Sequence, residues 1–193
     1  MIKYPNGKVG TYSKKTITRK PVASGNRGMG LEGDINDSNL YYKEKDLCLI
    51  TKRPTPINVV KVDYTHGAII TNAYFEKQST TDYNGVYKGR YIDFEAKSTQ
   101  SKTSLPLHNI PPQQIEHLKG VIRHGGIAFF IIEFAIKQET YLLDAQYVID
   151  LVNSKERKSI SHDFIIEHGH LIKRGYHPRL DYLEVVEKVY FKD

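Results

Sequence analysis

One stretch near the middle of the chain restricts the possible folds more than any other. Residues 127–134, IAFFIIEF, form an almost continuous apolar run. Such a run is typical of a strand inside a sheet, because both of its faces are then covered by other parts of the protein. The apolar core of the run is far shorter than the roughly 20 residues that a membrane span needs. The stretch therefore predicts a central strand with cover on both sides.

Helical and strand patterns alternate around this strand. We expect short strands at 47–51 and 140–144 and helices over about 28–42, 112–124, 144–152 and 179–191. Strands that alternate with helices predict an α/β architecture with a mixed central sheet flanked by helices. The 193 residues suffice for one well-packed domain, which we place at 27–193.

Positive charge is concentrated at the start of the chain. The sequence has 28 basic and 22 acidic residues, a net charge of +6, and seven of the basic residues precede the first acid, Glu32. We expect a flexible basic arm over residues 1–26 whose partner is a polyanion, with Lys14 and Lys15 among the contacts. Nucleic acid and an anionic membrane surface both fit, and the alternative is a solvated tail that only aids solubility.

The single cysteine and the N-terminal pattern indicate the compartment. Cys48 is the only cysteine, so neither an intrachain disulfide nor a zinc site of several cysteines can form, and its DLCLI context predicts a buried strand position. No apolar segment follows the first basic residues, so the secretory-signal pattern is missing. We expect a cytoplasmic protein without a membrane partner, and a DNA partner would associate it with the nucleoid. The histidines of EHGH (167–170) have a spacing that fits no common zinc pattern.

Residues 52–79 form a long excursion between strands of the predicted core. Two alternating patches, around 59–62 and 68–71, are joined through DYTHG and predict two paired strands. Insertions of this length in a compact domain are usually functional or disordered.

The following segment, 80–98, predicts a hairpin with chemistry on one face. In RYIDFEAKS, alternation places the apolar residues on one side of the strand and Asp93, Glu95 and Lys97 on the other. A two-residue turn at Lys88-Gly89 would place Asp82 opposite Glu95. Asn84-Gly85 is a stronger hairpin signal, and a turn there would separate the two acids.

Two directly opposed carboxylates destabilise a sheet unless something neutralises them. A divalent cation between Asp82 and Glu95 would remove the repulsion, and oxygen ligands with remaining waters suit Mg²⁺. The metal can generate a hydroxide nucleophile and polarise a phosphodiester. Lys97 would then stabilise charge on phosphate oxygens or orient the attacking water. The alternative is an ordinary charged sheet edge.

Long motifs along the whole chain resemble one family. Asp82 followed by Glu95-Ala96-Lys97 is similar to the signature of restriction-endonuclease-like nucleases. A closer resemblance, to the RecU-type Holliday junction resolvases of Gram-positive bacteria, is carried by YPNGK (4–8), NRGMGLE (26–32), KRPTP (52–56), STTDYNGVYKGRYIDFEAKST (79–99), LPLHNI (105–110), QQIEHLK (113–119) and PRLDYL (178–183).

The resemblance implies a homodimeric, Mg²⁺-dependent endonuclease, with Mn²⁺ able to substitute, that resolves four-way DNA junctions by paired nicks in recombination and repair. Its expected protein partners are a recombinase and a branch-migration helicase. Its core would be restriction-endonuclease-like, and 52–79 would be a stalk that enters the junction. The implied metal positions are Thr80, Asp82, Glu95 and Gln114, with Lys97 as the stabiliser of the transition state and Asp93 outside the ligand set.

The residues expected to meet DNA are basic or aromatic and lie on the arm, the entry of the first helix, the stalk and the hairpin. They are Lys14, Lys15, Arg27, Lys52, Arg53, Lys61, Phe75, Lys77, Lys88 and Arg90, with Glu32 in a supporting position near the site. Two alternatives remain: a non-catalytic architectural protein that binds junctions, and a nuclease of the same fold that acts on other branched or linear DNA.

Overall fold

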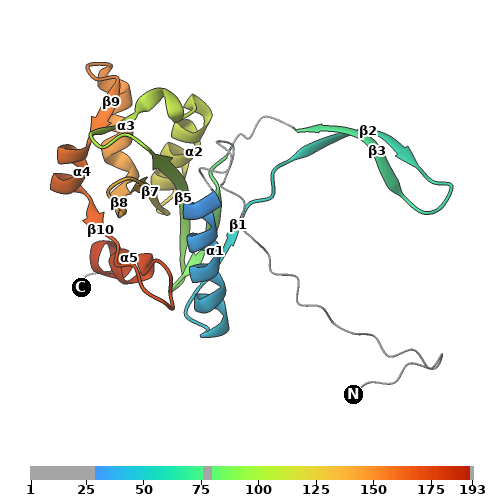
Figure 1. The fold of residues 1–193 in the computed structure, drawn as a ribbon, viewed down its shortest axis with the longest axis horizontal. Coiled ribbons are helices and arrows are strands. Elements are labelled where there is room, and N and C mark those ends of the chain that lie inside the picture. The colour runs from blue at the N-terminus through green and yellow to red at the C-terminus, as the bar shows by residue number, and fades with distance from the viewer. Residues whose placement is uncertain (1–28, 76–79, 192–193) are drawn as a thin grey trace, which may run out of the picture.

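A six-stranded sheet forms the centre of the protein in the computed structural model, which describes residues 29–75 and 80–191 (Figure 1). β5 and β7 run parallel, and the other neighbouring pairs are antiparallel. The predicted mixed sheet is therefore confirmed. Its strand order is β1 (Leu49–Lys52), β4 (Tyr83–Tyr87), β5 (Arg90–Thr99), β7 (Ile127–Phe134), β8 (Glu139–Asp144) and β10 (His170–Leu171).

The apolar run at the centre of the sequence forms β7, and all eight of its residues are buried. Successive side chains point to opposite faces of the sheet. Phe129 and Ile131 join one core cluster, whereas Phe130 and Ile132 join the other. The strand thus connects two apolar layers, as its composition predicts.

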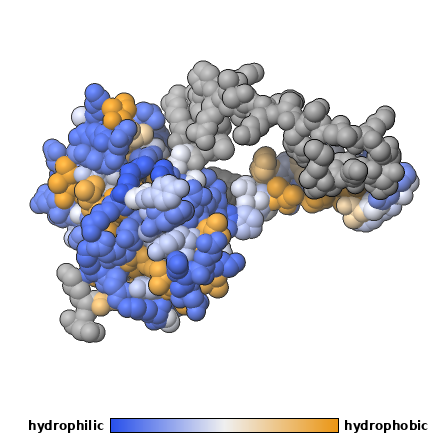
Figure 2. Space-filling model, turned by 60° about the horizontal axis from the view of Figure 1, so that its bottom comes forward, coloured by the Kyte–Doolittle hydropathy of each residue, from blue (hydrophilic) through white to orange (hydrophobic). Residues whose placement is uncertain are grey.

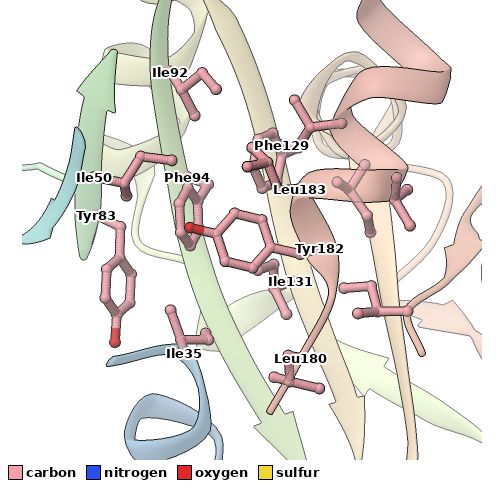
Figure 3. Packing of buried hydrophobic residues seen from close by; sticks show 14 of the residues in the cluster. Ile35, Ile50, Tyr83, Ile92, Phe94, Phe129, Ile131, Leu180, Tyr182 and Leu183 are labelled. Carbon is pink, nitrogen blue, oxygen red and sulfur yellow. The ribbon is translucent and has the colours of Figure 1, made fainter. Parts of the chain in front are cut away.

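Helices cover both faces of the sheet. α1 (Met29–Glu44) and α5 (Tyr182–Tyr190) pack on one face, and α2 (Pro112–Arg123), α3 (Ala145–Ser154) and α4 (His162–His168) pack on the other. On the first face, aromatic rings from the sheet and α5 meet beside α1 (Figure 3). The ring of Phe94 stacks on Phe129 with centroids 4.7 Å apart, and Tyr182 lies 5.4 Å from Phe94.

Local sequence signals explain where two of the helices begin. Pro112 occupies the first turn of α2, where its missing N–H costs no hydrogen bond. The Asp144 side chain accepts a bond of 2.8 Å from the Gln146 amide at the start of α3. A separate short antiparallel pair consists of β6 (Ser104–Pro106) and β9 (Ser159–Ser161). The 3₁₀ turn η2 (Leu107–Asn109) directly follows β6.

The excursion is a two-stranded ribbon that projects from the body, and we call it the stalk (Figure 1). β2 (Ile57–Asp63) pairs with β3 (Ile69–Phe75), with register shifts around Val60 that indicate a β-bulge. Large apolar side chains are exposed along it (Figure 2). Phe75 is 77% exposed. Exposed apolar surface of this kind usually marks an interaction site.

Three details differ from the sequence prediction. The strand expected at 47–51 is β1, where only Ile50 is buried because β1 is an edge of the sheet. Cys48, expected to be buried, is half-buried just before it. The last helix, expected over 179–191, begins at Tyr182. Among the described residues, no helix has the length and apolar character of a membrane span.

Candidate active site

The hairpin between β4 and β5 turns at Lys88-Gly89. Lys88 and Gly89 both have positive φ, at 45° and 76°, as a tight two-residue turn requires. Tyr87 pairs with Arg90, and the register continues without a shift along the hairpin. The alternative turn at Asn84-Gly85 is therefore wrong.

Gly85 has a different reason to be glycine. It lies inside β4, opposite Ile50 of β1. A Cβ atom at this position would lie 2.0 Å from the carbonyl oxygen of Leu49. The glycine thus permits the close approach of the edge strand, and its neighbour Asn84 takes part in ordinary strand pairing.

The register brings the two predicted acids together. The Asp82 amide donates to Glu95 Oε2 at 3.1 Å, and the Ala96 amide donates to Asp82 Oδ2 at 3.2 Å. Glu95 is 1% exposed, on the face of β5 that α2 covers. The predicted facing of Asp82 and Glu95 is confirmed.

The buried carboxylate has an unusual acidity. Burial raises the pKa of Glu95 to about 7, and the Asp82 charge acts in the same direction. Lys97 opposes this shift, because its Nζ lies 2.6 Å from Glu95 Oε1. Without a further cation, the site therefore holds Glu95 partly protonated at neutral pH.

Gln114 adds an oxygen to this group from the first turn of α2. It is 4% exposed, and its Oε1 finds no hydrogen-bond partner in the part of the chain that the structure describes. A buried polar atom without a partner is costly and calls for an explanation. A hard cation bound by carboxylate and amide oxygens supplies one, so the residues present fit Mg²⁺. Thr80 is half-buried two residues before Asp82.

The donor set is small. Within 29–75 and 80–191, no group of three or more His, Cys, Asp or Glu side chains is arranged to hold a metal ion. Asp82 and Glu95 supply two carboxylates, so a metal here would complete its coordination with the amide oxygen and with water or phosphate oxygens.

A second buried network lies beside the site, centred on Asp93. This carboxylate is fully buried and binds Arg53 at 2.7 Å and His117 at 2.9 Å. Sequence reasoning assigned Arg53 to DNA and placed Asp93 outside the ligand set, and it missed their pairing. The two residues are 40 positions apart, and no local pattern connects them.

The other residues predicted to meet DNA fall into three groups. Lys61 and Phe75 are exposed on the stalk. On the body, Lys52 pairs with Glu32 at 2.5 Å, Lys88 pairs with Glu187, and Arg90 donates to the Tyr190 carbonyl at 3.1 Å. The remaining four lie outside the described residues: Lys14, Lys15, Arg27 and Lys77.

Comparison with known proteins gives a consistent match. The profile of the RecU family, described as Recombination protein U, matches residues 26–188. The Holliday junction resolvase RecU of Geobacillus kaustophilus is 51% identical over 196 residues, and that of Bacillus cereus is 51% identical over 198 residues, with 98% of each chain covered in both cases. The solved structure of Hjc, a Holliday junction resolvase from Archaeoglobus fulgidus, covers 75% of this chain and 95% of its own, with a TM-score of 0.44 and 14% identity. That last likeness is too remote to support an inference.

The layered fold, the facing carboxylates and the adjacent lysine define an α/β nuclease. Because the profile covers most of the chain and the relatives are half identical over nearly their whole length, the chain belongs to the RecU family.

Proposed function

We propose that this protein is a divalent-metal-dependent endonuclease that resolves four-way DNA junctions by symmetric paired nicks during recombination and repair. The observation that carries the proposal is the pairing of half-buried Asp82 with buried Glu95, beside Lys97 and the unpartnered oxygen of Gln114. The names of the relatives support the junction as substrate.

The residues of the site have separable roles in this proposal. Asp82, Glu95 and Gln114, with Thr80 at the edge, would hold Mg²⁺, which when bound supplies Lewis acidity and an activated water. Lys97 is held by Glu95 on the same strand face and is 17% exposed, so it can reach a bound phosphate. Its ammonium group would stabilise the charge that develops on the phosphate oxygens.

The stalk supplies the preference for branched DNA. Its exposed apolar and aromatic surface, with Phe75 most exposed, suits stacking on unpaired or splayed bases at the open centre of a junction. Lys61 on the same ribbon would neutralise phosphate without reading sequence, which makes binding sensitive to salt. Recognition would then depend on the shape of the DNA.

Two symmetric cuts require two sites related by a two-fold axis. A C2 homodimer provides this arrangement, so we include a homodimer in the proposal. Each protomer would cut one strand of the junction.

The test is a cleavage assay on a labelled four-way junction with an immobile core. Wild type and Asp82→Asn are incubated with Mg²⁺ or with EDTA, beside a linear duplex that has the sequence of one pair of arms. We expect paired nicks at symmetric positions in the junction, dependent on Mg²⁺ and lost in the variant. Tight junction binding without cleavage under any divalent metal would instead favour an architectural protein, and equal cleavage of the duplex would favour a less selective nuclease.

A further inference from the structure

One buried carboxylate connects the root of the stalk to β5, the strand that carries Glu95 and Lys97. Asp93 is fully buried, and both of its oxygens are engaged. Oδ1 accepts from the Thr81 hydroxyl. Oδ2 contacts Arg53 Nη2 at 2.7 Å, the Tyr91 hydroxyl at 2.8 Å and His117 Nε2 at 2.9 Å.

Arg53 holds both ends of the stalk at this point. It directly follows β1, where the chain leaves the body, and its amide donates to the Asp82 carbonyl at 2.8 Å, where the chain has returned. Its Nη1 donates to the Thr81 hydroxyl at 2.8 Å, and its Nη2 reaches Tyr91 at 2.8 Å as well as Asp93. The side chain is 17% exposed, so its charge is directed into the protein.

Each candidate metal ligand has a close chain neighbour in this network. Thr81 directly precedes Asp82. Asp93 lies two residues before Glu95 on the same face of β5, and His117 lies one turn beyond Gln114 on α2. The network therefore connects the three segments that supply the ligands. A displacement of Arg53 would change the positions of all three segments.

We infer that Arg53 and Asp93 are a positioning pair that sets the spacing of Asp82, Glu95 and Gln114 from the root of the stalk, and that Arg53 acts within the protein and not on DNA phosphate. The planar guanidinium presents several donors in a fixed fork, which matches its simultaneous bonds to Thr81, Tyr91 and Asp93. A lysine keeps the charge but cannot reproduce that set. Supporting groups around a metal site typically matter about 10- to 100-fold in metal affinity or activity.

The metal part of this inference is testable without DNA. Mn²⁺ binding to the full-length protein is measured by the loss of the free Mn²⁺ signal in electron paramagnetic resonance, for wild type, Arg53→Lys and Lys61→Gln. We expect Arg53→Lys to weaken Mn²⁺ binding about 10-fold or more. Lys61→Gln, which removes an exposed charge on the stalk, should leave Mn²⁺ binding unchanged.

Junction affinity, measured in Ca²⁺ over a range of salt concentrations, distinguishes positioning from a phosphate contact. Lys61→Gln should lower affinity and reduce the salt slope by about one. Arg53→Gln should keep the wild-type salt slope. A reduced slope in Arg53→Gln, or wild-type Mn²⁺ affinity in Arg53→Lys, would overturn the inference.

Folding of each variant is checked by thermal unfolding. If Arg53→Lys fails to fold, Tyr91→Phe replaces it, because it removes only one hydroxyl of the network from a residue that is 38% exposed. Several-fold weaker Mn²⁺ binding in that variant supports the inference, and unchanged binding refutes it.

The consequence for cleavage rests on the proposed function, but the Mn²⁺ measurement does not. A wild type that binds Mn²⁺ and fails to cut junctions would overturn the proposed function alone. A wild type that cuts, with an Arg53→Lys variant that binds Mn²⁺ normally, would overturn the positioning role alone.

Discussion

Replacement of Glu95 by glutamine should stabilise the metal-free protein at high pH. Burial raises the pKa of Glu95 from 4.5 to about 7, and a tenfold change in acidity corresponds to about 1.4 kcal/mol. The folded state therefore binds this proton more tightly than the unfolded state does. Ionisation of Glu95 thus costs the fold about 3 kcal/mol, a cost that is absent below pH 4.5 and complete above pH 7.

The assay is urea unfolding in EDTA at pH 5 and pH 8.5, for wild type and Glu95→Gln. Every other titrating group is present in both proteins, so the difference between the two free energies of unfolding reports Glu95 together with its coupling to Asp82 and Lys97. We expect this difference to shift by about 2 to 3 kcal/mol in favour of the variant between the two pH values, since part of the cost is already present at pH 5. Added Mg²⁺ at pH 8.5 should stabilise the wild type far more than the variant.

The matched control is Glu116→Gln, which makes the same change on α2 at a side chain that is 69% exposed. Its free energy of unfolding should stay within about 0.5 kcal/mol of wild type at both pH values. If the difference between wild type and Glu95→Gln were the same at pH 5 and pH 8.5, Glu95 would titrate normally. The reasoning from its burial would then be wrong.

Three further predictions concern DNA. Lys97→Met should slow single-turnover junction cleavage about 100- to 1,000-fold while junction affinity in Ca²⁺ stays near wild type, because the lysine is proposed to act on charge in the transition state; a loss of affinity alone would contradict this. Deletion of residues 56–76 should reduce binding to four-way junctions more than to duplex in a mobility-shift titration, and equal losses would argue against the stalk as the reader of shape. Truncation of residues 1–26 should lower affinity and flatten its salt dependence, since the arm carries six basic residues before position 27; identical binding at all salt concentrations would exclude the arm.

The hairpin shows both the reach and the limit of reasoning from sequence. Alternation along 90–98 assigns Phe94 and Glu95 to opposite faces, and the structure confirms it. The turn was ambiguous, because Asn84-Gly85 has the composition of a tight turn. Gly85 is required by the close approach of β1, a strand more than 30 residues earlier in the chain, and only the assembled sheet reveals that contact.

The Asp93 network was beyond sequence reasoning for the same reason. Arg53 and His117 lie 40 and 24 residues from Asp93, on separate elements. Gln114 likewise has no distinguishing local signal, and its role in the site was expected only from family resemblance. Its oxygen is buried without a partner because α2 packs against β5, a contact that belongs to the tertiary structure.

The sequence alone determined the central strand β7, the alternation of β5, the two-stranded stalk and the acidic hairpin with its lysine. These features follow from hydrophobic periodicity and turn chemistry, which act over a few residues. The tertiary structure decided the register of the hairpin, the burial that raises the pKa of Glu95, and the inward direction of Arg53. These three features depend on which distant elements pack together, because burial and buried hydrogen bonds are properties of the assembled layers.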